Sequence, residues 1–142
     1  MELIHTVQAP QAVGPYSQAI KLANGFLYIS GQLGLNPTTM LLVDNISDQT
    51  RQVLANINAI LTAAKYTKDN VIKTTILLSD INDFVVVNEI YESFFKEHKP
   101  ARSTFAVKAL PKAALIEKKS LLLKKIVKTN YFKNIYIKQL GC

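Results

Sequence analysis

A run of β-branched residues and leucine, Val71 to Leu78, interrupted only by Lys73, is the feature that most limits the folds open to this chain. A run of this kind predicts a central strand buried on both sides. Before it, apolar residues recur three to four positions apart up to Ala64, and Ser47 suits the N-cap of that helix. After it, a second helix is predicted from about Ile81 and must end before Pro100.

Shorter segments complete the predicted sheet. Asn24-Gly25 separates two β-prone segments, and this dipeptide favours a hairpin with a two-residue turn of positive φ. Near the other end, Ser103 to Leu110 and Ala114 to Leu123 predict two further strands. The order strand, strand, helix, strand, helix, strand, strand predicts an α+β fold, in which both helices pack on one face of a mixed sheet. The other face then requires a second subunit, and a closed symmetric oligomer is expected.

Composition restricts the classes of protein that this sequence can form. With 142 residues, 49% of them apolar, one domain with a substantial core is expected. We find no run of eighteen apolar residues and no basic start followed by a short apolar block. The expectation is therefore a cytoplasmic protein that does not associate with a membrane, with an organelle as the alternative location.

Metal ligands and net charge are unevenly distributed. Cys142 is the single cysteine, and His5 and His98 have no carboxylate or sulfur at ligand spacing, so no disulfide framework and no metal site are expected. Residues 1–117 carry ten basic and ten acidic side chains, whereas residues 118–142 carry seven lysines and no acid. The net charge of +7 thus belongs to this Lys-rich segment, which can hold phosphates nonspecifically.

One basic and one acidic residue stand near the two C-terminal strands. Arg102 lies in Pro100-Ala101-Arg102-Ser103-Thr104-Phe105, and Glu117 follows twelve residues after Phe105. A strand, a turn and a second strand would bring the two into one small pocket. The guanidinium of arginine can donate two parallel hydrogen bonds to a carboxylate, and glutamate can transfer protons or position water. The pair indicates a site for a small acid, and the alternative is a surface ion pair.

Six motifs, in order, resemble one family, the Rid family (YjgF/RidA type) of reactive-intermediate deaminases, also named L-PSP endoribonucleases or translation inhibitors. They are Gly14-Pro15-Tyr16-Ser17-Gln18-Ala19, Ile29-Ser30-Gly31-Gln32, Val71-Ile72-Lys73-Thr74-Thr75, Asn82-Asp83-Phe84 with Val87-Asn88-Glu89-Ile90-Tyr91, Pro100-Ala101-Arg102-Ser103 and Leu110-Pro111-Lys112. The resemblance covers residues 3 to 117.

This resemblance implies a chorismate-mutase-like α+β fold and a homotrimer with three clefts, each shared between neighbouring subunits. It implies hydrolysis of 2-enamine and 2-imine acids, such as 2-aminoacrylate and 2-aminocrotonate, to 2-keto acids and ammonia. The corresponding enzyme class is 2-iminobutanoate/2-iminopropanoate deaminase. The family implies neither a cofactor nor a metal.

The resemblance also implies roles for individual residues. Arg102 matches the residue that binds the substrate carboxylate, and Glu117 matches the group that positions the attacking water and moves its proton. The other matching positions are substrate-binding and are Tyr16, Ser30, Gly31, Asn88 and Thr104. Thr104 stands where relatives often carry cysteine, so thiol chemistry is excluded at this position. Ser30 and Gly31 could instead simply end a strand, and Tyr16 could be an anchor below Pro15.

The sequence departs from the family pattern after Glu117. We expect a Rid-type domain over residues 1–117 and an atypical Lys-rich segment over 118–142. Lys119 to Lys124 can be encoded by codons that, shifted by one base, read Val-Ile-Ala-Ile-Lys, similar to the family's terminal strand. A frameshift in an AT-rich gene is thus one hypothesis for this segment, and a lineage-specific basic extension is the other. Sequencing the transcript decides, because an intact frame encoding these residues would exclude the frameshift.

Two other functions remain open at this point. The first is an endoribonuclease or translation inhibitor, in which the Lys-rich segment would bind RNA phosphates. The neutral charge of residues 1–117 and the absence of a histidine pair argue against it. The second is a trimer that binds a small keto acid without turnover, with Arg102 as the anchor and Glu117 misplaced.

Overall fold

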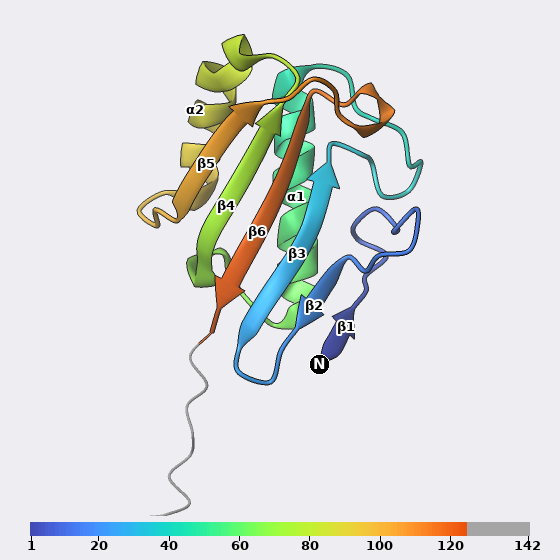
Figure 1. The fold of residues 1–142 in the computed structure, drawn as a ribbon, viewed down its shortest axis with the longest axis vertical. Coiled ribbons are helices and arrows are strands. Elements are labelled where there is room, and N and C mark those ends of the chain that lie inside the picture. The colour runs from blue at the N-terminus through green and yellow to red at the C-terminus, as the bar shows by residue number, and fades with distance from the viewer. Residues whose placement is uncertain (125–142) are drawn as a thin grey trace, which may run out of the picture.

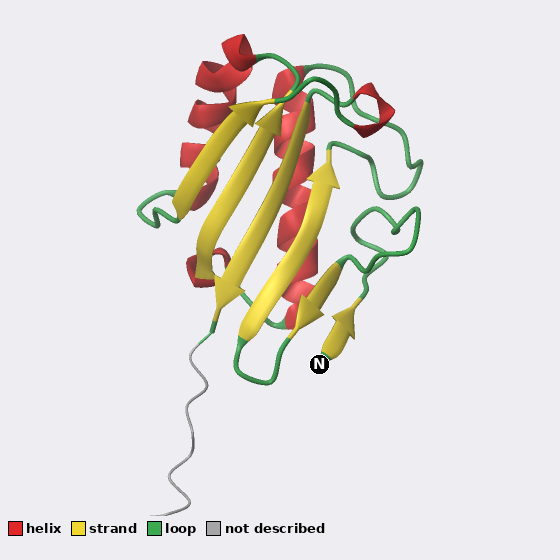
Figure 2. Cartoon of the chain, viewed as in Figure 1, coloured by secondary structure: helices red, strands yellow, loops and turns green. Residues whose placement is uncertain are grey.

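The computed structural model describes residues 1–124, which form a six-stranded mixed sheet with two long helices on one face (Figures 1 and 2). The strand order is β1-β2-β3-β6-β4-β5, with β4 and β5 parallel and the other neighbours antiparallel. The elements are β1 Glu2–Ile4, β2 Ala19–Lys21, β3 Phe26–Leu33, α1 Ile46–Ala64, β4 Val71–Leu78, α2 Phe84–Phe95, β5 Ala101–Ala106 and β6 Ile116–Leu123. The predicted α+β class is confirmed, and β1 is a strand that was not predicted.

The predicted hairpin joins β2 and β3, but its turn differs from the expected one. The Gly25 N–H donates to the Leu22 carbonyl over 3.1 Å, and Gly25 alone in the turn has a positive φ, +89°. This is a three-residue loop, whose last position needs the left-handed conformation that glycine adopts at low cost. Asn24 therefore does not take the positive φ that a two-residue turn requires.

Helix α1 covers the centre of the sheet. Asn45, not Ser47, is its N-cap, because the Asn45 side chain accepts a hydrogen bond from the Asp48 N–H over 3.0 Å. Its predicted apolar stripe is confirmed, and Val53 and Ile57 are fully buried against the sheet. The helix ends at Ala64. The next residue, Lys65, adopts the left-handed conformation, and its N–H donates hydrogen bonds to the carbonyls of Leu61 and Thr62 in the last turn.

The second helical region begins as predicted, but as a short 3-10 turn at Ile81–Asp83 that leads into α2. Val87, Tyr91 and Phe95 are buried and form the side of α2 that faces the core. Phe84 is exposed, because it lies beside β5 at the margin of the core. Strand β4 is buried only on the face toward the helices, so the prediction of burial on both faces is wrong for a single chain.

Strand β6 is the unexpected part of the sheet. β6 lies between β3 and β4 and pairs with both along its length, so the predicted last strand is central in the sheet. The boundary expected after residue 117 falls inside this strand. Residues 125–142, which hold most of the Lys-rich segment, lie outside the described residues.

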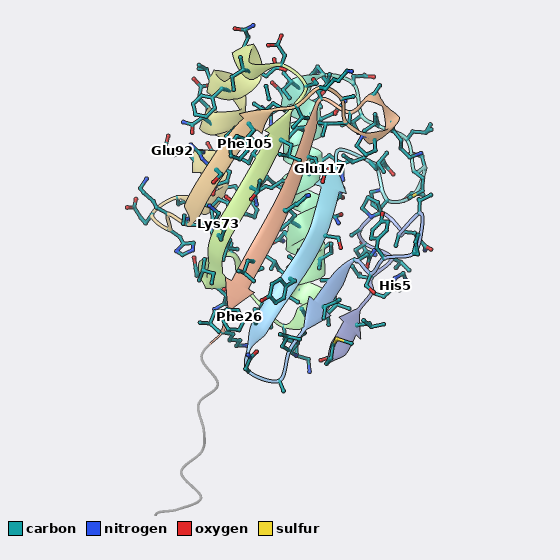
Figure 3. The ribbon with its side chains drawn as sticks, viewed as in Figure 1. His5, Phe26, Lys73, Glu92, Phe105 and Glu117 are labelled. Atoms are coloured by element: carbon teal, nitrogen blue, oxygen red, sulfur yellow. The ribbon has the colours of Figure 1, made fainter. Side chains whose placement is uncertain are left out.

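The sheet face away from the helices is uncovered within residues 1–124. Tyr28, Phe105 and Leu123 are exposed on it, with exposed fractions of 48%, 55% and 37%. Figure 3 shows this face toward the viewer, with Lys73, Phe105 and Glu117 on it. An apolar face of this kind indicates contact with another molecule. Among the described helices, none is long and apolar enough to cross a membrane.

Candidate active site

Glu117 is the second residue of β6 and lies on the uncovered sheet face, beside an irregularity in β3. Between Ile29 and Gln32 the β3–β6 register shifts by one residue, so that Ser30 and Gly31 together lie opposite Lys119. Such a bulge bends the strand and redirects its side chains. The Glu117 side chain, only 14% exposed, lies where a Cβ on Gly31 would be. The missing side chain at Gly31 thus makes the space that the carboxylate occupies.

Replacing Gly31 by alanine is therefore expected to displace the Glu117 carboxylate, because the new Cβ would lie 2.7 Å from its Cδ. If Glu117 is catalytic, kcat/KM should fall by roughly 10² to 10³ with the melting temperature nearly unchanged, since the side chain can rotate away. Gly34→Ala is the matched control. Its Cβ would meet the Gln49 backbone at 2.7 Å, so it should lower the melting temperature instead. Full activity in Gly31→Ala would contradict the assignment.

The loop that precedes β2 forms one wall of a cavity of about 560 Å³ beside Glu117. The buried Gln18 side chain holds this loop: it accepts from the Thr6 N–H and donates to the carbonyls of Thr6 and Pro10. Tyr16 lines the cavity, and its hydroxyl accepts a hydrogen bond from the Val13 N–H over 3.3 Å. Tyr16 is thus both an anchor of its own loop and a cavity wall.

Two further hydrogen bonds fix the frame around the carboxylate. The Ser30 hydroxyl donates to the Ser17 carbonyl over 2.6 Å, so that its proton is engaged and its oxygen can still accept. Before β6, the Leu115 N–H donates to the buried Gln49 side chain over 2.9 Å. Gln49 also donates to the Val43 carbonyl, and so ties helix α1 to two loops next to Glu117. We call Tyr16, Ser30, Gly31 and Glu117 the glutamate half-site.

Arg102 occupies a different place, on the helix-facing side of the edge strand β5. Its guanidinium lies 4.8 Å from the ring centre of Tyr91 and 5.6 Å from that of Phe84, both on α2. The Tyr91 hydroxyl shares a 3.0 Å hydrogen bond with Thr74, and burial raises the pKa of the phenol, which stays neutral. Within residues 1–124 no carboxylate pairs with Arg102. Its five donors are available to an acid.

Asn88 and Thr104 accompany Arg102. Asn88 lines a cavity of about 380 Å³ together with Arg102. Thr104 lies two residues along β5 from Arg102 and therefore on the same face. Its buried hydroxyl has no hydrogen-bond partner among the described residues, an arrangement that is costly unless a ligand completes it. We call Asn88, Arg102 and Thr104 the arginine half-site.

The two half-sites do not meet within one chain. On β4, Arg102 lies opposite Thr74 and Glu117 opposite Leu77, so the two residues project from opposite faces of the sheet. They are also roughly 10 Å apart along the strands and roughly 10 Å across them. The expected single strand-turn-strand pocket is therefore wrong, because β4 lies between β5 and β6. The structure brings together the residues within each half-site, and their roles stay predictions.

A third charged residue lies in the core behind the sheet. Lys118 is 1% exposed and donates to the Ser120 hydroxyl over 3.2 Å. Its ammonium lies 5.7 Å from the ring centre of Tyr91 and 5.1 Å from that of Phe95. Burial lowers its pKa to about 7, because the apolar surroundings disfavour the charged form. This position could be predicted from the sequence, because side chains two residues apart on a strand share one face, and Lys118 follows the apolar Ile116 by two positions.

The described residues contain no group of three histidine, cysteine, aspartate or glutamate side chains placed to hold a metal ion. The two half-sites offer a guanidinium that can bind a carboxylate, and a carboxylate at a cavity that can accept a proton from water.

Comparisons with known proteins identify the family and the fold of this chain. Residues 6–124 match the family described as Endoribonuclease L-PSP. A RutC family protein of Pyrococcus horikoshii is 52% identical over 124 residues, covering 87% of this chain and 98% of the relative. The human 2-iminobutanoate/2-iminopropanoate deaminase is 49% identical over 116 residues, covering 81% of this chain and 84% of the relative.

A solved structure of the conserved Rid protein family, YyfA from Yersinia pestis, matches with a TM-score of 0.84 and 51% identity, over 87% of this chain and 98% of that one. The chain belongs to the Rid family. Its fold is the Rid fold, and the family match extends through β6 to residue 124.

The cavity beside Glu117 also contains residues to which the comparison with the Rid family motifs assigned no role. Lys112 and Lys119 line the cavity of the glutamate half-site. The Lys119 ammonium lies 3.8 Å from Glu117 Oε1. The place of Lys119 could have been predicted from the sequence, because Lys119 follows Glu117 by two positions and therefore lies on the same face of β6. Gln18, which holds the Tyr16 loop, could be recognised only from its contacts.

Proposed function

We propose that this chain hydrolyses reactive 2-enamine and 2-imine acids, such as 2-aminoacrylate and 2-aminocrotonate, to 2-keto acids and ammonia, as a 2-iminobutanoate/2-iminopropanoate deaminase. The observation that carries the proposal is that one chain presents both a guanidinium that no carboxylate engages within residues 1–124, Arg102, and a largely buried carboxylate at a cavity, Glu117. The human relative, which bears this enzyme's name, supports it.

The active unit that we propose is a homotrimer in which each cleft takes its arginine half-site from one subunit and its glutamate half-site from the next. Three features support this arrangement: the separation of the half-sites within one chain, the position of β5 at the sheet edge, and the uncovered apolar face. A closed ring uses the same two surfaces at each contact, so all three clefts are equivalent.

In this cleft Arg102 binds the substrate carboxylate through two parallel hydrogen bonds and so orients the C=N carbon toward Glu117. Glu117 accepts a proton from water as the water oxygen bonds to that carbon, and it then passes this proton to the nitrogen. In the resulting carbinolamine Glu117 moves the hydroxyl proton to the nitrogen, the C–N bond breaks, ammonia leaves, and the hydroxyl oxygen becomes the keto oxygen. One water is consumed and no redox change occurs. Orientation and proton transfer together supply on the order of 10² to 10⁴ in rate.

The alternatives have less support in the described residues. An endoribonuclease of the kind that the family description names would need acid-base groups at a phosphodiester. The His98 ring nitrogen is instead engaged with the Val71 carbonyl at 2.6 Å. A binding protein without turnover would need Arg102 but not Glu117, and the space that Gly31 leaves for the carboxylate argues for a function of Glu117.

The test couples the purified protein to a serine or threonine dehydratase and follows keto-acid release while semicarbazide competes for the imine. Wild-type protein should accelerate release, and Arg102→Ala should lose the acceleration, because the substrate carboxylate then has no anchor. The melting temperature and assembly state of both proteins provide the control. A folded trimer of the wild type that leaves the rate unchanged would overturn the proposal.

A further inference from the structure

The glutamate half-site carries more positive charge than the proposed hydrolysis needs. Lys119 lies opposite the Ser30-Gly31 bulge with 53% of its side chain exposed and its ammonium 3.8 Å from Glu117 Oε1. Lys112 lines the same cavity, and no ion pair engages it within residues 1–124. Neither lysine has a part in binding the 2-carboxylate or in moving the proton of water.

The charges in the complete cleft favour a doubly negative substrate. A neighbouring subunit brings Arg102 together with Lys96, Lys99 and Glu92, which line the same cavity, so cations outnumber carboxylates in the complete cleft. A substrate with one carboxylate pairs with Arg102 and leaves Lys112 and Lys119 facing Glu117 alone. A second carboxylate on the substrate would give these two exposed ammonium groups a further partner, through a charge-assisted hydrogen bond.

We propose, on the basis of the deaminase function above, that Lys119, together with Lys112, binds a second carboxylate and makes dicarboxylic 2-imino acids the preferred substrates. Lys119 is then a specificity-determining residue rather than a catalytic one. The bonds formed and broken are those of the hydrolysis already described: water adds to C=N and ammonia leaves. The second carboxylate stays unchanged and needs no further reactant.

The test uses the full chain and two imines made in place by amino-acid oxidases, one from 2-aminobutanoate and one from glutamate, with semicarbazide as competitor. The measured quantity is the ratio of kcat/KM for the dicarboxylic imine to that for the monocarboxylic imine. It should exceed one in the wild type and fall about tenfold in Lys119→Met, mainly through KM, which corresponds to one lost charge-assisted hydrogen bond. Lys108→Met, at an exposed position outside the cavity, should leave the ratio unchanged.

A ratio that stays the same in Lys119→Met overturns the inference while the deaminase function stands. Failure to accelerate either imine overturns the deaminase function, and a binding measurement then decides the inference by itself. Wild-type protein should bind 2-ketoglutarate at least tenfold more tightly than 2-ketobutyrate in calorimetry, and Lys119→Met should lose that preference. Equal binding of the two acids by the wild type would overturn it.

Discussion

Subunits carrying Arg102→Ala mixed with subunits carrying Glu117→Gln are expected to recover activity that neither variant has alone. Each variant lacks one half-site in every cleft, so each should lose a factor on the order of 10² to 10⁴ in kcat/KM. In a mixed trimer, some clefts receive the intact Arg102 from one subunit and the intact Glu117 from its neighbour. Random mixing in equal amounts makes about one quarter of the clefts intact, because closed rings place subunits independently.

This recovery is measured by unfolding the two variants together, refolding them, and applying the dehydratase-coupled assay. Each variant refolded alone serves as the control, and two different affinity tags allow mixed trimers to be isolated. Isolated mixed trimers that remain as inactive as the parents would rule out a cleft shared between subunits. The experiment therefore tests the separation of Arg102 and Glu117 on opposite faces of the sheet, which no single substitution can test.

Replacing Lys118 by isoleucine should stabilise the protein strongly. The ammonium is 1% exposed and has one hydroxyl partner, Ser120, so a charged lysine there is poorly compensated. The pKa falls from 10.5 to about 7 on folding, which corresponds to roughly 5 kcal/mol of stability lost at neutral pH and below. Isoleucine removes this cost and packs against the rings of Tyr91 and Phe95.

The pH dependence provides the specific signature of Lys118. Between about pH 7 and 10.5 the unfolded chain binds one more proton than the folded chain at this residue, so the wild-type free energy of unfolding should rise with pH. Lys118→Ile should abolish that rise, and the exposed Lys108→Ile should retain it. Denaturant titrations across this range supply the measurement. An equal slope in wild type and Lys118→Ile would show that the amine reaches water.

Features encoded within a few consecutive residues could be predicted from the sequence. The hairpin at Gly25 depends on the conformation of one glycine, and the burial of Val53 and Ile57 depends on a helical repeat. For both, the physical cause lies in the backbone preference or side-chain period of a short segment. The residues of the two half-sites were proposed from the resemblance to the Rid family, and their roles stay predictions.

Features that depend on residues distant in sequence could not be predicted. The residues Ile116 to Leu123 do not indicate that this strand lies between β3 and β4. It is this position that separates Arg102 from Glu117. Likewise, the Ser30-Gly31 bulge exists only in relation to Lys119 on the opposite strand. Strand β1, with three residues, is too short to show a period.

The central position of β6 has a consequence for how the chain is made. Both of its partner strands are translated earlier, β3 roughly 90 residues earlier, and they have no contact with each other until β6 arrives between them. A nascent chain that ends before residue 116 therefore holds two separate pieces of sheet with exposed apolar edges. Folding should wait until synthesis has passed residue 124, so premature termination leaves an aggregation-prone product rather than a smaller domain.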